Sequence, residues 1–416
     1  MTHLPPALAQ NALPSQQVLA ELEHLKAEDA DWRAGHVPMY VFHASDALSE
    51  LSKQAFGTYF SENAHATKAL PSVAALQDSV IQSALALMRS PSDSDGLFTS
   101  GGTESIFLAM AAARDRARER GVEASEPKII LPASCHPGFD KAAHYLGLQV
   151  TRVPIGSDYR ADVSRMAELI DSDTIAVVGS APSFPHGVID PIEELAAIAA
   201  ERDIWLHVDA CVGGYIAPFL RHAGHAVPDF DFVLEGVTSI SADLHKYGYA
   251  PKPASTLLFR SYADAKHARF VFEDWPRGQY ASSAFGGTRP AGPIAASWAL
   301  MRTLGINGYV NLAMQALDVR DRLISGIMEI DGLQIVGKPD LTIFAYGAEG
   351  LDIHAVGDLL EESGWFVARN VTPPSLHFMA MPVHDQIIES YLSDLSDAVA
   401  HVRRTGQTSL GNTVTY

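Results

Sequence analysis

Residues 174–209, TIAVVGSAPSFPHGVIDPIEELAAIAAERDIWLHVD, carry the pattern that decides the fold. Two short runs of apolar and β-branched residues, TIAVVGS at 174–180 and DIWLHVD at 203–209, flank a helical pattern at 191–201. Apolar strands separated by helices are typical of a mostly parallel sheet that is covered on both faces. The alternation continues outward, and we expect further strands at 128–132, 148–154, 237–241 and 255–259 and helices at 104–120, 137–146 and 161–170.

The pattern changes on both sides of this region. We expect an N-terminal helical segment at 1–52, a large α/β domain at 53–290 and a smaller C-terminal α+β domain at 291–416. In the large domain, ligands should bind at the carboxyl ends of the strands. The other expected elements are helices at 15–30, 71–88, 292–304, 308–328, 354–364 and 385–402 and strands at 341–346 and 375–381, and the last residues, GQTSLGNTVTY, are expected to be mobile.

Composition narrows the classes of partner and the compartment. The 416 residues carry a net charge of −19, which argues against nucleic acid or an anionic membrane as the main partner, since both need a basic face. Cys135 and Cys211 form no CxxC pair, so we expect a reducing compartment, no disulfide scaffold and no metal site. The first ten residues lack the pattern of a secretory signal, and no run of 18 apolar residues occurs, so the cytoplasm is the expected location.

The first candidate site is the segment TSGGTES at 99–105. Gly101 and Gly102 allow a ligand to approach the backbone closely, and the free N–H groups of a helix N-terminus attract an anion. Together with Thr103 these residues can cradle a phosphate. The alternative is a tight turn in which Thr103 caps the helix.

Two further candidates each follow an expected strand. Asp209 ends the run IWLHVD, and a buried carboxylate there needs a partner such as a protonated pyridine nitrogen. The alternative is that Asp209 caps the next turn. His136, after the strand at 128–132, can stack on a flat ring, or it is an ordinary polar residue of a loop.

The fourth candidate is a lysine beside a histidine. Lys246 lies just beyond the strand at 237–241, is preceded by His245, and can form a Schiff base with an aldehyde. Most lysines are solvated surface groups, which is the alternative here. The residues that follow Lys246, Tyr-Gly-Tyr, do not have a surface composition.

The order of these elements favours a shared function over four unrelated ones. A Gly-Gly-Thr turn, a histidine, an aspartate and a His-Lys pair follow one another at strand ends within one doubly wound region. This is the arrangement of the fold-type I enzymes, which use pyridoxal 5′-phosphate (PLP). We therefore expect the PLP-dependent transferase fold, with PLP bound covalently to Lys246.

Several longer stretches resemble the sphingosine-1-phosphate lyase family, a branch of the group II decarboxylase superfamily. They include SGGTESIFLAM at 100–110, TSISADLHKYGYAPK at 238–252 and QYASSAFGGTRPAG at 279–292. Eukaryotic members of that family carry a membrane-spanning N-terminus. We find no such run in this sequence and therefore expect it to resemble the soluble bacterial branch.

The resemblance implies a role for each candidate residue. Lys246 would carry the Schiff base, Asp209 would pair with the pyridine nitrogen, and His136 would stack on the ring. Gly101, Gly102 and Thr103 would hold the cofactor phosphate, with His245 close by. The family is dimeric with shared active sites, so a homodimer is expected, in which Gly287 and Thr288 reach the phosphate of the neighbouring subunit's cofactor. The family's contacts with the substrate phosphate fall on Tyr40, His65 and Lys252, although the residues around Tyr40 and His65 depart from the family pattern.

The expected activity is retro-aldol cleavage of a phosphorylated 2-amino-3-hydroxy long-chain base. An amino-acid decarboxylase of the same superfamily is the alternative, because it shares every cofactor residue. A decarboxylase needs a cation aimed at an α-carboxylate, whereas the lyase needs one aimed at a more distant phosphate. A third hypothesis is a protein that binds PLP without catalysis.

Overall fold

The computed structural model describes residues 11–409 and residue 411. Its centre is a seven-stranded sheet with the order β1-β7-β6-β5-β4-β2-β3. β7 runs antiparallel to β1 and β6, and the other neighbouring pairs are parallel, which confirms the prediction of a mostly parallel sheet. The sequence predicts neither β1 nor the reversal of β7. The strands are β1 (Asp95–Thr99), β2 (Lys128–Pro132), β3 (Gln149–Val153), β4 (Thr174–Ser180), β5 (Trp205–Asp209), β6 (Ser239–Ala242) and β7 (Ser255–Phe259).

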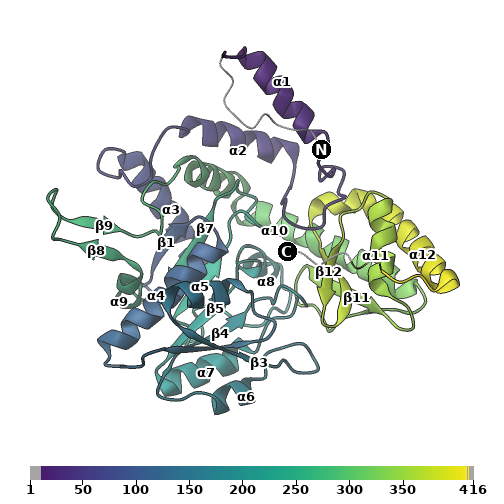
Figure 1. Cartoon of the computed structure of the whole chain (residues 1–416). Coiled ribbons are helices and arrows are strands. Elements are labelled where there is room, and N and C mark those ends of the chain that lie inside the picture. Colours follow the sequence, from purple (N-terminus) through teal and green to yellow (C-terminus); the bar gives the residue numbers. More distant parts are fainter. Residues whose placement is uncertain (1–10, 410, 412–416) are drawn as a thin grey trace.

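Helices cover both faces of this sheet, as expected (Figure 1). α4 and α5 pack on one face, where Leu131 and Trp205 are buried. α3, α7 and α8 pack on the other face, where Leu206 and Val208 are buried. Because successive side chains of a strand point to opposite faces, a sheet covered on both sides needs the continuous apolar runs seen in the sequence. The helices of this region are α3 (Pro71–Leu87), α4 (Gly102–Glu119), α5 (Gly138–Leu146), α6 (Val163–Glu168), α7 (Ile192–Arg202), α8 (Ala217–His222) and α9 (Tyr262–Ala265), with short 3-10 turns at Gly213–Tyr215 and Lys266–Ala268.

The C-terminal part has a second core around a four-stranded antiparallel sheet of order β10-β11-β13-β12. α11 and α12 pack together, and both contribute to this core. α10 (Gly292–Glu329) joins the two parts and breaks at Gly305, whose φ of 54° is non-helical, so the two helices predicted at 292–304 and 308–328 are both present. The other elements are β10 (Leu333–Ile335), β11 (Ile343–Ala348), α11 (Ile353–Glu362), β12 (Ala368–Val371), β13 (Pro374–Met379), a 3-10 turn at Pro382–Ile387 and α12 (Ile388–Thr405).

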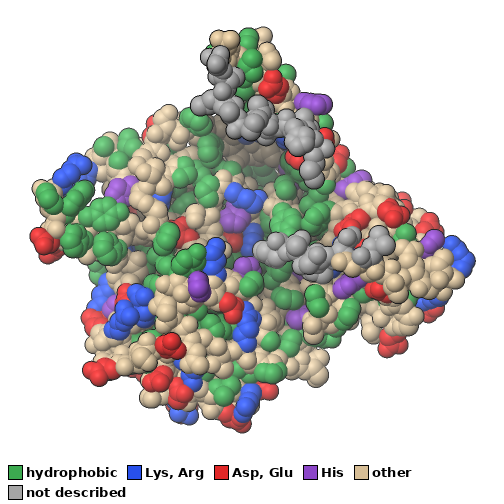
Figure 2. Space-filling model, in the orientation of Figure 1, with side chains coloured by type: hydrophobic (Ala, Val, Ile, Leu, Met, Phe, Trp, Pro, Cys, Tyr) green, Lys and Arg blue, Asp and Glu red, His purple; other side chains and the backbone are tan. Residues whose placement is uncertain are grey.

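Two segments extend away from the body of the molecule, α1 (Ser15–Lys26) and the hairpin of β8 (Phe270–Phe272) with β9 (Tyr280–Ser282) (Figure 1). In the described part of the chain α1 buries none of its side chains. All three residues of β8 are exposed, and Figure 2 shows apolar side chains gathered over the hairpin. The sequence predicts α1, but it predicts neither the hairpin nor α2 (Asp46–Thr58), which packs on α10.

Two expectations for the chain ends lie outside the described residues, in whole or in part. The segment examined for a secretory signal falls on residues 1–10, and most of the expected mobile tail falls on residues 410 and 412–416. In residues 11–409 and 411, no helix combines the length and the apolar character that crossing a membrane requires.

Candidate functional site

The Gly-Gly-Thr turn joins β1 to the N-terminus of α4. Gly101 is the N-cap and Gly102 the first helical residue. A Cβ on Gly102 would lie 2.6 Å from Sγ of Cys211 and 3.3 Å from Oδ2 of Asp243, so a side chain there would displace buried neighbours. The turn therefore brings the positive end of an 18-residue helix close to these two side chains.

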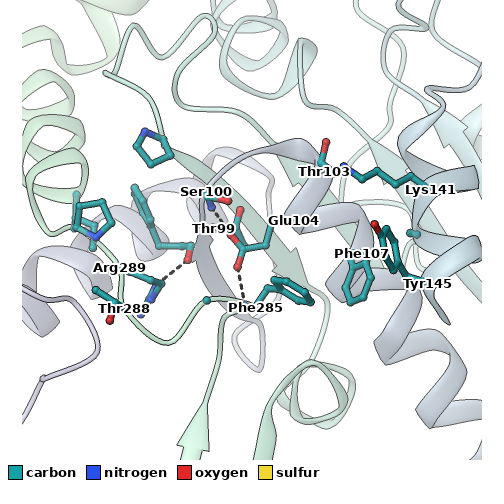
Figure 3. A pocket seen from close by; sticks show the side chains of 16 residues that line it. Thr99, Ser100, Thr103, Glu104, Phe107, Lys141, Tyr145, Phe285, Thr288 and Arg289 are labelled. Atoms are coloured by element: carbon teal, nitrogen blue, oxygen red, sulfur yellow. Dashed lines mark hydrogen bonds between the residues drawn. The ribbon is translucent and has the colours of Figure 1, made fainter. Parts of the chain in front are cut away.

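Thr103 and Ser100 line a cavity of about 570 Å³ (Figure 3). Its opposite wall is formed by the loop that carries Phe285 and Thr288. Glu104 ties this loop to the turn, because its two carboxylate oxygens accept hydrogen bonds from the backbone N–H of Ser100 (2.6 Å) and of Phe285 (2.8 Å). The loop thus lies against the Gly-Gly-Thr turn of its own chain.

Gly287 and Thr288, which are expected to reach the cofactor of the neighbouring subunit, lie in this loop. Thr288 lines the same cavity as Thr103 within one chain, and Gly287 is exposed beside Tyr280. The assignment of Gly287 and Thr288 to the partner's cofactor stays a prediction.

Asp209 is the last residue of β5 and is 9% exposed. Its Oδ1 atom accepts hydrogen bonds from the backbone N–H of Cys211 (3.1 Å) and from Oγ of Ser241 (3.4 Å). The hydrogen bonds described for the carboxylate all go to Oδ1, which leaves Oδ2 for a ligand. Asp209 thus does cap the following turn, but with one of its two oxygens.

Lys246 lies four residues beyond β6, and its Nζ atom is 3.0 Å from Oδ2 of Asp243. Burial alone would lower the pKa of Lys246, but the negative charge of Asp243 outweighs it and the pKa is raised. His245 lies on the other side of the same carboxylate, with Nε2 at 3.6 Å from Oδ2, and donates from Nδ1 to the carbonyl oxygen of Ala254 (2.7 Å). Burial lowers the pKa of His245, so the imidazole tends to be neutral.

His136 follows β2 and lines a second cavity, of about 1000 Å³, between the two parts of the chain. Its Nδ1 atom accepts the backbone N–H of Gly138 (2.9 Å), and burial lowers its pKa. Arg152 on β3 holds the loop in place by donating to the carbonyl oxygens of Ala133 (2.9 Å) and Cys135 (3.0 Å). The orientation of His136 is therefore set by its own backbone turn and by an arginine from the neighbouring strand.

These side chains fit PLP. The charges of Asp209, Lys246 and Asp243 all act on the pKa of His136, and Nζ of Lys246 lies 3.0 Å from Asp243, so these groups lie near one another. With the Gly-Gly-Thr turn they offer an amine for the aldehyde, a carboxylate for the ring nitrogen and a helix N-terminus for the phosphate. Oδ1 of Asp243 is buried without a hydrogen-bond partner among the described residues, so a polar partner is missing there. In those residues no group of three or more His, Cys, Asp or Glu side chains can hold a metal ion.

The three residues expected to contact the substrate phosphate have different surroundings in the structure. Lys252 is exposed, and its charge is one of the causes that lower the pKa of His245. His65 is exposed, with its ring centroid 5.9 Å from that of Tyr280. Tyr40 lines the second cavity, with its ring centroid 5.6 Å from that of Phe366.

Three side chains of the site are missing from the sequence prediction. Asp243 carries the clearest signal, because it is a carboxylate at the end of a buried strand and three residues before Lys246, as Asp209 ends β5. Cys211 is considered only for its redox state, although its Sγ atom approaches Gly102. Arg152 has no local signal, since it acts through carbonyl groups that only the parallel pairing of β2 and β3 brings near.

Comparisons with known proteins agree with this geometry. The family described as "Pyridoxal-dependent decarboxylase conserved domain" matches residues 1–348. The sphingosine-1-phosphate lyase of Oryza sativa subsp. japonica is 40% identical over 398 residues, which cover 94% of this chain and 73% of that protein. A probable L-tyrosine/L-aspartate decarboxylase of Methanothermobacter thermautotrophicus is 42% identical over a shorter span of 306 residues, 73% of this chain and 82% of that protein. The solved structure of a Burkholderia pseudomallei sphingosine-1-phosphate lyase superposes with a TM-score of 0.93 at 34% identity, over 97% of this chain and 94% of that one.

Proposed function

This chain belongs to the sphingosine-1-phosphate lyase family of pyridoxal-dependent enzymes, and from that premise we propose that it cleaves the Cα–Cβ bond of a phosphorylated 2-amino-3-hydroxy long-chain base. Sphingosine 1-phosphate would give a long-chain aldehyde and phosphoethanolamine. The enzyme is a PLP-dependent lyase, and the fold is that of the PLP-dependent decarboxylases and lyases.

The residues of the site divide the work as follows. Lys246 would hold the cofactor covalently, His136 would stack on its ring, and Asp209 would pair with its protonated ring nitrogen. Gly101, Gly102, Thr103 and His245 would bind its phosphate. When bound, PLP supplies an electron sink for negative charge at the substrate Cα. Loss of the 3-hydroxyl proton converts the substrate Cβ into an aldehyde carbon as the Cα–Cβ bond breaks, and Nζ of Lys246 returns a proton to Cα.

The observation that supports the choice of substrate is the position of Lys252. Lys252 is exposed and forms no ion pair within the described part of the chain, and desolvation, followed by the nearby charge of Lys246, lowers its pKa. An accessible cation without an ion pair, six residues beyond Lys246, suits a dianionic phosphate. We propose that Tyr40 and His65 complete the phosphate site, with the contribution of a second subunit.

The arginines near His136 are less suited to the decarboxylase alternative. Both line the second cavity, where an α-carboxylate would need a free cation. Arg152 is committed to Asp140 and to backbone carbonyl groups. Arg369 pairs with Asp358 at 2.9 Å and with Glu361 at 2.5 Å. Charge-compensated arginines bind a further carboxylate weakly, so this cavity favours the lyase.

We propose a homodimer with shared active sites. The support is apolar surface that a single chain leaves exposed. Exposed apolar surface of this kind usually marks a protein–protein interface. The contributing side chains are Val18, Leu19 and Leu22 on α1, Phe270, Val271, Phe272 and Trp275 on the hairpin, and Phe285 in the loop. A cytoplasmic location is also proposed, on the support of two buried cysteines that remain as free thiols.

One assay separates the three hypotheses. Purified protein loaded with PLP is incubated with sphingosine 1-phosphate, and long-chain aldehyde and phosphoethanolamine are measured in parallel. Release of carbon dioxide from a panel of amino acids is the counter-test. Aldehyde formed in equal amount to phosphoethanolamine supports the lyase, carbon dioxide release supports the decarboxylase, and neither product supports PLP binding without catalysis.

A further inference from the structure

A continuous row of buried hydrogen bonds runs beneath Asp209. Nε1 of Trp205 lies 2.7 Å from Oγ of Ser239, which lies 2.8 Å from Nδ1 of His207. Nε2 of His207 lies 3.2 Å from Oγ of Ser241, which lies 3.4 Å from Oδ1 of Asp209. Four of the five side chains are at most 1% exposed, and Asp209 is 9% exposed.

The pairing of β5 with β6 builds this row. Trp205, His207 and Asp209 alternate along β5 and therefore point to one face of the sheet. His207 is opposite Ser239, and Asp209 is opposite Ser241, in the parallel register. Polar groups in the middle of a sheet that is covered on both faces are costly unless each finds a partner, and here each one does.

The Asp209 end of the row sets the direction of its hydrogen bonds. An ionised Asp209 can only accept, so Ser241 donates its one proton to Oδ1 and accepts from Nε2 of His207 and from Sγ of Cys211 (3.3 Å). A neutral His207 then carries its proton on Nε2 and accepts at Nδ1 from Ser239. The Trp205 end is compatible with this direction, because Trp205 can only donate and Ser239 keeps its own proton for Nδ1 of His207.

We propose that His207 is a positioning residue that acts through Ser241 to hold the Asp209 carboxylate oriented for the cofactor's ring nitrogen. The inference rests on the proposed role of Asp209. Because Ser241 and the backbone N–H of Cys211 both bind Oδ1, the row fixes the rotation of the carboxylate and leaves Oδ2 for the ring nitrogen. Burial lowers the pKa of His207 to about 4, so the imidazole stays neutral near pH 7 and the direction of the row is preserved.

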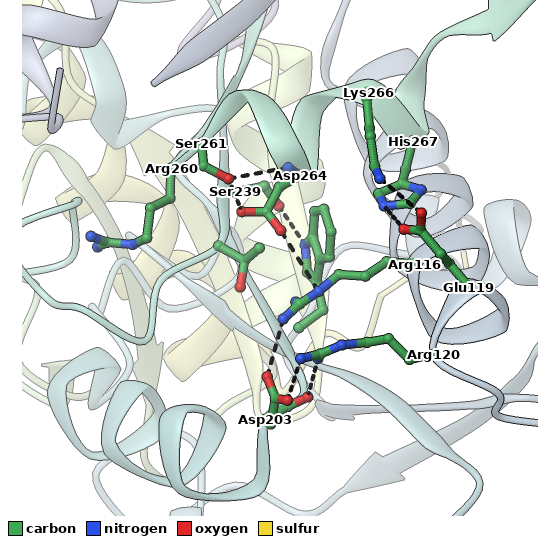
Figure 4. Close-up of polar contacts among 12 residues, drawn as sticks. Arg116, Glu119, Arg120, Asp203, Ser239, Arg260, Ser261, Asp264, Lys266 and His267 are labelled. Atoms are coloured by element: carbon green, nitrogen blue, oxygen red, sulfur yellow. Dashed lines mark hydrogen bonds and ion pairs between the residues drawn. The ribbon is translucent and has the colours of Figure 1, made fainter. Parts of the chain in front are cut away.

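The far end of the row is anchored by charged groups. The guanidinium carbon of Arg116 lies 5.6 Å from the ring centroid of Trp205. Arg116 itself lies between Asp203 and Asp264, near Ser239, as Figure 4 shows. Arg116 of α4 therefore holds the ring of Trp205, the first residue of the row, in place.

The first test reads the tautomer without any turnover. The full-length holoenzyme is labelled with ¹⁵N-histidine, and the long-range ¹H–¹⁵N spectrum is assigned at His207 by the signal that His207→Gln removes. We expect a neutral ring protonated on Nε2, both with PLP and after its removal. A ring protonated on Nδ1, or an imidazolium, reverses the row and overturns the inference.

The second test reads the cofactor. Ser241→Ala should raise the dissociation constant of PLP about tenfold, the scale of losing one hydrogen bond to a charged group, and should shift the absorption of the bound cofactor. In an Asp209→Asn background Ser241→Ala should add almost nothing, because the two changes break one interaction. Ser297→Ala is the matched control, since Ser297 is 1% exposed and donates to a helix carbonyl outside the site.

The inference is overturned if Ser241→Ala raises the dissociation constant of PLP by the same factor in the wild type and in Asp209→Asn. It is also overturned if Ser241→Ala leaves that constant unchanged. Because His207→Leu can also disturb folding, His207→Gln is compared with it, as the amide of Gln can still donate to Ser241. Recovery of PLP affinity in His207→Gln relative to His207→Leu supports the row, and equal losses count against it. None of these measurements uses a substrate, so a failure of the proposed lyase activity would be seen separately.

Discussion

Nζ of Lys246 lies 3.0 Å from Oδ2 of Asp243, a buried carboxylate whose other oxygen has no hydrogen-bond partner among the described residues. The carboxylate raises the pKa of Lys246 against the opposing effect of burial. An amine must be neutral to attack an aldehyde. Before the cofactor arrives, Asp243 therefore holds Lys246 in its protonated, unreactive form.

Asp243→Asn should accelerate the reaction of the apoprotein with PLP near neutral pH. Removing the charge lowers the pKa of Lys246, so a larger fraction of the amine is neutral at any given pH. The rate of covalent uptake, followed by stopped-flow absorbance, should rise with pH in the wild type and level off at a lower pH in the variant. Lys246→Ala serves as the control without a covalent phase. Identical pH profiles for wild type and variant would show that Asp243 does not control Lys246.

Lys246→Ala should abolish turnover while the protein still binds PLP noncovalently through the Gly-Gly-Thr turn. In the wild type, borohydride reduction should fix the cofactor irreversibly, and peptide mass spectrometry should find it on Lys246. Circular dichroism of the variant checks that its fold is intact. Normal activity in Lys246→Ala, or a label on Lys252, would end the assignment.

Asp209→Asn should lower kcat by roughly 10²-fold or more, the scale of removing one electrostatic stabiliser of a transition state. KM should change little, since the charge matters most when negative charge develops at Cα. Steady-state kinetics with sphingosine 1-phosphate measure both constants. A kcat within a few-fold of wild type would leave Asp209 with only the structural role of capping the turn at Cys211.

The features that the sequence predicts are those with local causes. The apolar runs of β4 and β5 predict a parallel sheet, and the helical patterns at 292–304 and 308–328 predict the two halves of α10, which the structure breaks at Gly305. His136, Asp209 and Lys246 can be grouped from the sequence because each lies at or just beyond the end of a predicted strand, and the carboxyl ends of parallel strands meet at one edge.

The features that the sequence does not predict depend on pairing between distant segments. The reversal of β7 follows from its place between β1 and β6, which no local pattern encodes. The row of hydrogen bonds that ends at Asp209 depends on the register that pairs His207 with Ser239. In the sequence, its only sign is the alternation of polar residues in WLHVD and SIS. The hairpin of β8 and β9 has exposed apolar residues on short strands, so the usual alternation of buried and exposed positions is absent.

Sharing of sites between subunits can be tested by mixing two inactive proteins. Lys246→Ala lacks the amine, and Thr288→Glu should repel the cofactor phosphate. If Thr288 serves the partner's site, each hybrid dimer has one intact site, and random mixing of two-subunit assemblies should restore about one quarter of wild-type activity. If Thr288 serves the cavity of its own chain, every hybrid stays inactive although native mass spectrometry shows that it has formed.

The phosphate site is tested by comparing two proteins with two substrates. Lys252→Ala should reduce kcat/KM for sphingosine 1-phosphate by roughly one to two orders of magnitude, because a charge-assisted hydrogen bond contributes about 1.5–3 kcal/mol. Unphosphorylated sphingosine should be a poor substrate for the wild type and little affected by the change. Lys338→Ala, at an exposed lysine outside the site, is the matched control and should preserve the preference for the phosphate. Equal turnover of sphingosine and its phosphate by the wild type, or an unchanged preference in Lys252→Ala, would contradict the phosphate site and favour the decarboxylase.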